Sequence, residues 1–244
     1  MYIKEKITDY WSDRAESYSQ QNQFQLTSCY DKWKSLLLQY APDRKNTKIL
    51  DVGTGPGFFA ILLAKEGYQV TAVDQNAEML RCAQENARQA GVDICFLQTG
   101  DELPFADGSM DMIVARDVTW MQLEPEKVLE SWYRILKKDG CLLYFDAEWY
   151  GYLRDERQAQ EYRSFRRYVK EQSGFVYEKA NEMERLAAEF PLTYQERPKW
   201  DGEFWKSLNP RQVSCKTELN PIVYSEIEQL QYAKTPEFLV CVQK

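Results

Sequence analysis

The chain has 244 residues, of which 44% are hydrophobic and 28% are charged, so it is long enough to bury a substantial core. Its formal net charge of -7 argues against a nucleic-acid partner, because phosphate binding normally needs a basic surface. The absence of histidine excludes histidine-containing triads, histidine general bases and histidine metal sites.

The first 47 residues contain two helical patterns, in the segments KITDYWSDRAESYSQ and TSCYDKWKSLLLQYA. The charged N-terminus lacks a signal-peptide core, and no window of 18 apolar residues occurs. The six cysteines are scattered, and Cys95, Cys141 and Cys241 fall inside apolar runs, which indicates reduced core thiols. We therefore expect a cytoplasmic protein that does not enter a membrane.

Residues 48 to 145 alternate between short apolar runs and amphipathic segments. Strands are predicted in KILDVG, YQVTAVD, DICFLQT, MDMIVAR and CLLYFDA. Helices are predicted in FFAILLAKEG, NAEMLRCAQENARQAG and PEKVLESWYRILKKDG, the last with Gly140 at its C-cap position. This alternation is typical of βαβ units and predicts an α/β fold with a doubly wound, mostly parallel sheet.

The pattern changes after the fifth strand. Residues 151 to 190 carry two helical patterns rich in charge and tyrosine, including the basic stretch RSFRRYVK (163 to 170), which we interpret as a solvated helix face. Strands are predicted in QVSCKTEL and EFLVCVQK, with a helical connection in YSEIEQLQYAK. These two strands would complete a seven-stranded sheet.

The first strand ends in ILDVGTGPGFFA, in which Asp51 is followed by Gly53, Gly55 and Gly57. Glycine permits positive φ and leaves no Cβ in the way of a ligand, and the helix that follows offers free N–H groups. A dinucleotide fingerprint would need glycine where Phe58 stands, and a phosphate loop would need Gly-Lys-Ser/Thr after it. A glycine turn without a ligand remains an alternative from this segment alone.

Four blocks in order, over residues 48 to 146, resemble the class I S-adenosylmethionine-dependent methyltransferases. They are the glycine loop, the strand end VTAVD with Asp74 and the following QNAEML, the segment ELPFADGSMDMIVA, and RILKKDGCLLYFD. The N-terminal YWSDRAESY also resembles the lid of many small-molecule members. The resemblance implies a Rossmann-like fold, S-adenosyl-L-methionine as cofactor and no metal.

The resemblance implies a cofactor site with the glycine loop at the methionine end, Asp74 at the ribose and the lid closing over both. Asp51 would orient the loop, and Arg116 would reach the methionine end. The usual adenine-contacting aspartate is replaced by Thr99, so Gly100 or Asp101 would contact adenine. The full expected set is Tyr10, Trp11, Arg14, Tyr18, Asp51, Gly53, Gly55, Gly57, Asp74, Gln75, Met79, Gly100, Asp101, Glu102 and Arg116.

The methyl acceptor is expected beyond the fourth and fifth strands. Acids among aromatic residues suit a cationic or planar acceptor, so an amine or a heterocyclic nitrogen is the first expectation. The expected pocket residues are Asp117, Trp120, Trp149, Tyr150, Trp200 and Trp205, with Tyr162 added by the insertion; as an alternative, the tryptophans pack the core. Candidate bases are Asp117, Asp146 and Tyr18.

These observations predict a methyltransferase that acts on a small molecule by direct methyl transfer. The alternatives are a non-catalytic protein that binds S-adenosylmethionine or S-adenosylhomocysteine, and an RNA or protein methyltransferase. Four segments are expected within one compact monomer or homodimer: a helical lid (1–47), the cofactor-binding core (48–150), a helical and aromatic insertion (151–212) and the C-terminal strands (213–244).

Overall fold

A computed structural model describes residues 2–42, 47–100, 102–173 and 179–244 of the chain. Within them, seven strands form one sheet in the order β3-β2-β1-β4-β5-β7-β6. The strands are β1 (Lys48–Val52), β2 (Gln69–Asp74), β3 (Cys95–Gln98), β4 (Met110–Arg116), β5 (Leu136–Asp146), β6 (Gln212–Lys216) and β7 (Phe238–Gln243). Strands β1 to β5 pair in parallel, and β7 pairs antiparallel with both β5 and β6. The predicted α/β fold with a mostly parallel seven-stranded sheet is confirmed.

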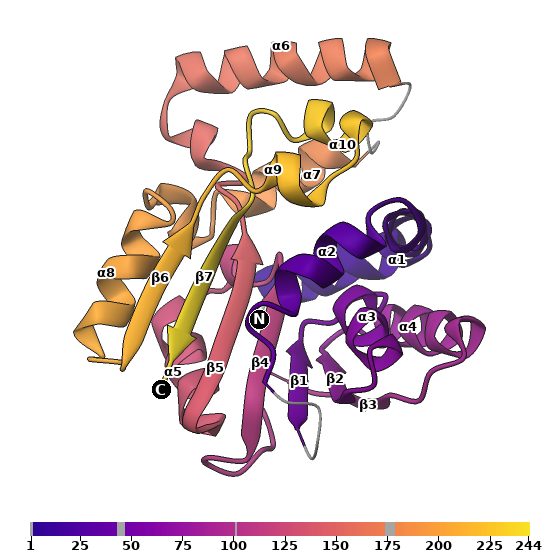
Figure 1. Cartoon of the computed structure of the whole chain (residues 1–244). Coiled ribbons are helices and arrows are strands. Elements are labelled where there is room, and N and C mark those ends of the chain that lie inside the picture. The colour runs from indigo at the N-terminus through magenta and orange to yellow at the C-terminus, as the bar shows by residue number, and fades with distance from the viewer. Residues whose placement is uncertain (1, 43–46, 101, 174–178) are drawn as a thin grey trace.

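Helices cover both faces of the sheet and the edge at which the parallel strands end (Figure 1). They are α1 (Tyr2–Ser28), α2 (Tyr30–Leu37), α3 (Phe58–Lys65), α4 (Ala77–Ala90), α5 (Pro125–Ile135), α6 (Glu156–Ser173), α7 (Ala180–Ala187), α8 (Lys199–Ser207), α9 (Asn220–Val223) and α10 (Glu226–Gln231). Short 3-10 turns are η1 (Thr119–Met121), η2 (Gly151–Arg154) and η3 (Pro191–Tyr194).

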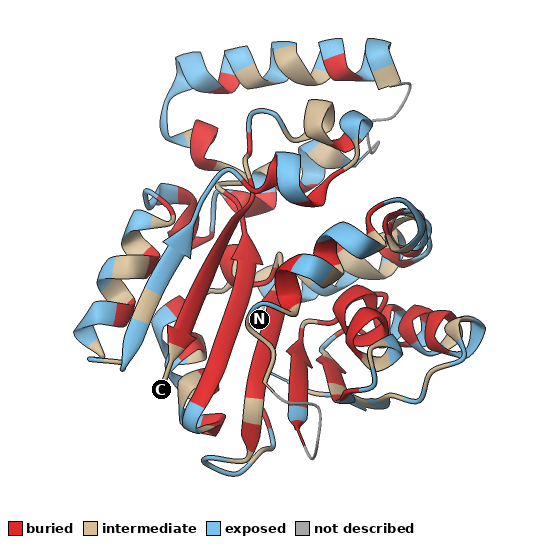
Figure 2. Ribbon diagram, viewed as in Figure 1, coloured by how far each residue is buried: buried red, intermediate tan, exposed pale blue. Residues whose placement is uncertain are grey.

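The central strands are buried on both faces, as their apolar runs require (Figure 2). On one face α2 and α3 pack Trp33 against Phe58, Phe59 and Phe145, with ring centroids 5.2–5.8 Å apart. On the other face α5 and α8 supply Trp132 and Trp205 to a second core. The sheet is therefore held between two helical layers.

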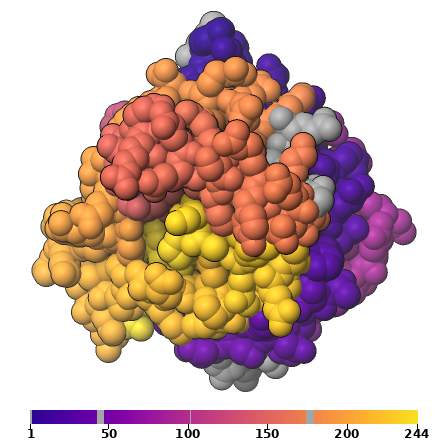
Figure 3. Space-filling model, turned by 90° about the horizontal axis from the view of Figure 1, so that it is seen from above, coloured from indigo at the N-terminus to yellow at the C-terminus, as the bar shows by residue number. Residues whose placement is uncertain are grey.

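The carboxyl ends of β1, β4 and β5 point toward α1, α6, α7 and α10 (Figure 1). Seen from above, α6 and the C-terminal segment of α9 and α10 spread over this edge, with α1 and α2 along one side (Figure 3). Ligands of open α/β sheets bind at this edge. Of the helices in the described part of the chain, none has the length and apolar run that a bilayer crossing needs.

Two local expectations are wrong. Helix α5 ends at Ile135, and Gly140 lies inside β5, because Leu136 already pairs with Met110 of β4. The carbonyl groups left at the end of α5 accept hydrogen bonds from Lys244 Nζ instead of ending in a glycine cap. Cys95 is exposed because β3 is an edge strand, whereas Cys141 and Cys241 are buried as expected.

Candidate functional site

The glycine loop between β1 and α3 is fastened by the buried carboxylate of Asp51. Its Oδ2 accepts hydrogen bonds from Thr54 Oγ1 at 2.6 Å and from Ala60 N at 3.0 Å. Burial raises the pKa of Asp51 to about 7, although the hydrogen bonds from Thr54 and Ala60 lower it in part. Asp51 thus holds the loop onto the first turn of α3.

All three glycines of the loop have positive φ, at 64° for Gly53, 53° for Gly55 and 93° for Gly57. A Cβ at Gly53 would lie 2.4 Å from a methyl carbon of Val118, and one at Gly57 would lie 3.3 Å from a side chain of α4. At Gly55 the nearest atom is a ring carbon of Tyr18 at 3.6 Å. Gly53 and Gly57 therefore allow close packing, while Gly55 faces α1.

Asp74, at the end of β2, joins the first two strand ends. Its Oδ2 accepts a hydrogen bond from Gly55 N, and its Oδ1 accepts one from Asn76 N, both at 2.8 Å. Asn76 caps α4 and also donates to Thr8 O at 3.0 Å and Ser12 Oγ at 2.9 Å. Burial raises the pKa of Asp74, while the bonds from the two backbone amides lower it. Asn76, a recognisable N-cap in the sequence, is a link to α1 that the sequence analysis missed.

Helix α1 lies along α4 through a small apolar cluster. Ala15, Met79 and Cys82 are buried there, with Trp11 and Tyr18 packed against them. The rings of Trp11 and Tyr18 are 5.6 Å apart. Met79 therefore packs against α1, and it lines neither of the two cavities described below.

Arg14 also lies on α1, between Trp11 and Tyr18. Its guanidinium donates hydrogen bonds to Gln21 Oε1 at 3.2 Å and Ser17 Oγ at 3.5 Å. The neighbouring carboxylates of Asp13 and Glu16 form ion pairs with a lysine and an arginine from elsewhere in the chain.

A small cavity of about 30 Å³ lies between the glycine loop and α1. It is lined by Tyr18, Asn22, Asp51, Gly53, Thr54, Gly55, Phe58, Phe59 and Arg116. The cavity thus joins the loop to Tyr18, which was expected in the lid, and to Arg116, which was expected at the methionine end of a cofactor.

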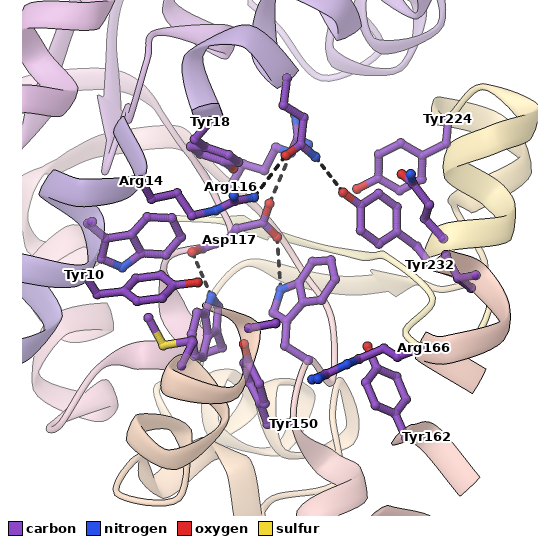
Figure 4. Close-up of a pocket in the computed structure, with 18 residues that line it drawn as sticks. Tyr10, Arg14, Tyr18, Arg116, Asp117, Tyr150, Tyr162, Arg166, Tyr224 and Tyr232 are labelled. Carbon is purple, nitrogen blue, oxygen red and sulfur yellow. Dashed lines mark hydrogen bonds and ion pairs between the residues drawn. The ribbon is translucent and has the colours of Figure 1, made fainter. Parts of the chain in front are cut away.

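A larger cavity of about 240 Å³ continues from Tyr18 and Arg116 toward the insertion (Figure 4). Its walls are Tyr10, Trp11, Arg14, Tyr18, Gln21, Arg116, Asp117, Trp120, Trp149, Tyr150, Tyr162, Arg166, Val169, Ala180, Met183, Tyr224, Gln231 and Tyr232. Figure 4 shows Asp117 near the middle, with Tyr18 and Arg116 at one end and Tyr150, Tyr162 and Arg166 at the other. The strand ends, lid and insertion named in the sequence analysis therefore meet around one space.

Asp117 has a strained backbone, with φ at 59°, directly after β4. Its Oδ1 accepts a hydrogen bond from Trp149 Nε1 at 3.1 Å, and its Oδ2 lies 3.4 Å from Arg116 Nε. Its backbone carbonyl accepts a hydrogen bond from Trp120 Nε1 at 2.9 Å. Burial raises the pKa of Asp117 to about 7, and Arg116 offsets part of this effect. A carboxylate held this way at a cavity wall can exchange a proton near neutral pH.

Tyr18 and Arg116 differ from Asp117 in their ionisation. Burial raises the pKa of Tyr18 to about 12, and Asp117 adds to the effect, so the phenol keeps its proton at neutral pH. Burial lowers the pKa of Arg116, but Tyr224 and Asp117 outweigh it and raise the pKa overall. The Arg116 guanidinium also lies 4.8 Å from the ring centroids of Trp33 and Phe58.

The expectation that Asp146 faces the acceptor is wrong. The Asp146 side chain is fully buried, and its Oδ2 accepts hydrogen bonds from Trp120 N at 2.9 Å, from Arg197 Nη1 at 3.0 Å and from Thr119 Oγ1. Arg197 binds Asp201 as well, through two further hydrogen bonds of 2.7 and 2.9 Å. This network anchors α8 to the end of β5, so Asp146 is structural.

Trp200 and Trp205 also lie away from the cavity, in the second core beneath α8. Trp205 is fully buried and donates a hydrogen bond from Nε1 to Tyr144 Oη at 2.9 Å. Trp200 stacks on Phe204 with ring centroids 5.4 Å apart. The alternative that these tryptophans pack the core is the one observed.

Asp74 itself lines neither of the two cavities, and the same holds for the described residues that were expected near adenine. Gln75, Gly100 and Glu102 are exposed and line neither of the two cavities. Asp101 lies outside the described residues.

Several residues in the walls of the larger cavity were not predicted from the sequence. Tyr224 follows α9, Gln231 ends α10 and Tyr232 follows α10. Gln21 of α1 contacts this segment by donating from Nε2 to Tyr232 Oη at 2.7 Å. No motif in YSEIEQLQYAK predicts that this segment reaches the cavity. The available signals were its helical period and its position before β7.

Comparison with known sequences identifies the part of the chain that carries the loop and the strand ends. A family described as "Methyltransferase domain" matches residues 50–144. The chain is 32% identical over 142 residues to the ubiquinone/menaquinone biosynthesis C-methyltransferase UbiE of Haemophilus ducreyi, covering 54% of this chain and 53% of that protein. It is 26% identical over 168 residues to the uncharacterized methyltransferase YcgJ of Bacillus subtilis, covering 68% and 65%. The chain thus spans about half to two thirds of these relatives.

Solved structures share the fold. A putative S-adenosyl-L-methionine-dependent methyltransferase from Methanococcus maripaludis superposes with a TM-score of 0.63 at 17% identity, covering 96% of this chain and 93% of that one. Phosphoethanolamine N-methyltransferase 2 of Haemonchus contortus, in complex with S-adenosyl-L-methionine, gives 0.61 at 18% identity, covering 86% and 51%. These structures show the predicted fold, and the family match over residues 50–144 together with the UbiE relative confirms the resemblance to methyltransferases.

Proposed function

We propose that this chain, whose residues 50–144 belong to the methyltransferase domain family, is an S-adenosylmethionine-dependent methyltransferase acting on a small molecule. The proposal rests on two features that lie next to each other, the glycine loop and the larger cavity. A loop fastened by Asp51 and Asp74 stands at the strand ends, and a cavity of about 240 Å³ begins beside it at Tyr18 and Arg116. A cofactor on the loop would present its reactive end to that cavity.

In this proposal Asp74 binds the ribose hydroxyls, because its carboxylate is already oriented by two backbone amides. Arg14 and Arg116 meet the cofactor carboxylate, and Gly55 leaves room beneath Tyr18. Gln75, Gly100, Asp101 and Glu102 remain candidates for the adenine side. Bound S-adenosylmethionine would supply a methyl group on a sulfonium, which needs no metal.

The acceptor nucleophile would lie at Asp117. Trp149 and Arg116 hold this carboxylate, and the aromatic walls exclude water and favour a planar or cationic group. An amine or a heterocyclic nitrogen would donate its proton to Asp117 as the carbon–nitrogen bond forms and the sulfur–methyl bond breaks.

The six thiols, all free, support a reducing compartment such as the cytoplasm.

The proposal predicts that purified protein converts S-adenosylmethionine to S-adenosylhomocysteine when a pool of amines and nitrogen heterocycles is added. Mass spectrometry of S-adenosylhomocysteine and of methylated products measures this. Asp74→Asn is expected to reduce turnover at limiting cofactor by about 10- to 100-fold, since a charge-assisted hydrogen bond is lost.

Asp93→Asn is the matched control: Asp93 is an exposed carboxylate before β3, whereas Asp74 accepts the hydrogen bond from Gly55 N of the glycine loop. Cofactor binding without any acceptor-dependent product would support a non-catalytic binding protein and contradict the enzyme.

A further inference from the structure

The basic stretch RSFRRYVK on α6 is not uniformly a solvated face. Arg163, Arg167 and Lys170 are exposed, as expected, but Arg166 turns inward and lines the larger cavity. Its side chain is 22% exposed, against 46% for Arg163. Figure 4 shows Arg166 beside Tyr150 and Tyr162, at the end of the cavity remote from Tyr18.

The charge of Arg166 is shared with one nearby carboxylate. Arg166 Nη1 lies 3.2 Å from Glu184 Oε2, and its Nη2 donates to Asn181. The same Glu184 also pairs with Arg163 at 3.0 Å and accepts a hydrogen bond from Tyr152 Oη at 2.9 Å. Arg163 also lies 3.7 Å from Glu156, so Glu184 is shared and Arg166 is the guanidinium of this group that lines the cavity.

Phenol groups stand next to this charge. Burial raises the pKa of both Tyr150 and Tyr162, so both keep their protons, while the nearby Arg166 acts in the opposite direction. Protonated phenols and a guanidinium are donors that suit an oxyanion. Asp117, in contrast, supplies a carboxylate near the middle of the cavity. The cavity therefore offers a carboxylate at its middle and the guanidinium of Arg166 with two phenols at the end remote from Tyr18.

We propose that Arg166 binds an acidic group of the methyl acceptor, so that the substrate joins a nucleophilic nitrogen at Asp117 to a carboxylate or phosphate at Arg166. This inference rests on the proposed function and narrows its substrate class. It makes Arg166 a specificity residue: the planar guanidinium selects acceptors that carry an oxyanion. A neutral acceptor would leave Arg166 paired only with the shared Glu184 and would form no ion pair of its own with the guanidinium.

Matched pairs of probes test the inference. One arm compares 4-(aminomethyl)benzoate with benzylamine, and the other compares phosphoethanolamine with ethanolamine, so the arms separate carboxylate from phosphate. Calorimetry measures the affinity of each probe for protein saturated with S-adenosylhomocysteine and for unloaded protein. In at least one arm the acidic probe should bind about 10-fold or more tightly than its neutral partner.

Three variants test whether Arg166 causes the higher affinity for the acidic probe. Arg166→Gln should abolish the advantage of the acidic probe, and Arg166→Lys should retain part of it because the charge remains. Arg163→Gln is the matched control: it breaks the ion pair with the same Glu184 but does not touch the cavity, so the advantage should persist. Thermal unfolding of each variant verifies that it folds.

Equal affinities for acidic and neutral probes in both arms would overturn the inference, as would an equal loss in Arg163→Gln and Arg166→Gln. Failure of S-adenosylhomocysteine to bind would instead contradict the proposed function. The two failures are distinguishable because the probe pairs are measured with and without that nucleoside.

Discussion

Replacing Asp117 with asparagine is expected to lower kcat/KM for methyl transfer by about 100- to 10,000-fold, the usual contribution of a general base. Asparagine tolerates the positive φ of this position and can still accept the hydrogen bond from Trp149, so the backbone should stay in place. The variant loses the ability to take a proton and the charge that pairs with Arg116. Steady-state kinetics with an identified acceptor measure the effect.

The pH dependence follows from the pKa of about 7 at Asp117. The carboxylate is the active form, so kcat/KM for the wild-type protein should rise with pH and level off above about 7, and Asp117→Asn should lack this rise. Binding of S-adenosylhomocysteine should be retained in the variant. An unchanged rate and pH profile would show that Asp117 is not the base.

Replacing Arg197 with methionine should destabilise the fold by about 3–5 kcal/mol, because it leaves buried charge without a partner. The Arg197 side chain is 1% exposed and binds Asp146 and Asp201, whose side chains are fully buried. Burial raises the pKa of Asp146, and Arg197 lowers it in part. Urea unfolding at pH 7 measures the change in the free energy of unfolding.

The loss of stability in Arg197→Met should depend on pH. Without Arg197, which lowers the pKa of Asp146, this pKa should rise further in the folded state. An acid whose pKa is raised in the folded state loses stability as pH rises, so the deficit of Arg197→Met should be smaller at pH 5 than at pH 8. Arg211→Met is the control: its ion pair with Asp139 is exposed, and its loss should cost less than about 1 kcal/mol. Similar losses in both variants would contradict the structural role given to Asp146.

The sheet was predictable because its strands are short, apolar and separated by amphipathic helices, a pattern that requires burial on both faces. The loop at Asp51 and the acid at Asp74 followed from the same order, since parallel strands place their ends at one edge. The end of α5 was not predictable in the same way. The sequence RILKKDG has helical propensity, but pairing of Leu136 with Met110 places the residues from Leu136 onward in β5.

The acceptor side was harder to predict because nearby residues of one strand face opposite layers. Leu142 and Tyr144 of β5 pack in the core under α8, and Asp146 follows them at the same period of two. The local sequence identifies Asp146, Trp200 and Trp205 as candidates. It does not predict which face of the sheet α8 covers. Tyr224 and Tyr232 reach the cavity through a C-terminal connection more than 100 residues beyond Asp117, a tertiary contact without a local signature.

The central claim is that the glycine loop and Asp74 bind S-adenosylmethionine. Titration calorimetry with S-adenosylhomocysteine tests it most directly, on the wild-type protein, Asp74→Ala and the exposed control Asp93→Asn. We predict one nucleoside per chain for the wild type and the control, and an affinity at least about 10-fold weaker for Asp74→Ala. No heat of binding in the wild type, or equal affinity in Asp74→Ala, would contradict the claim.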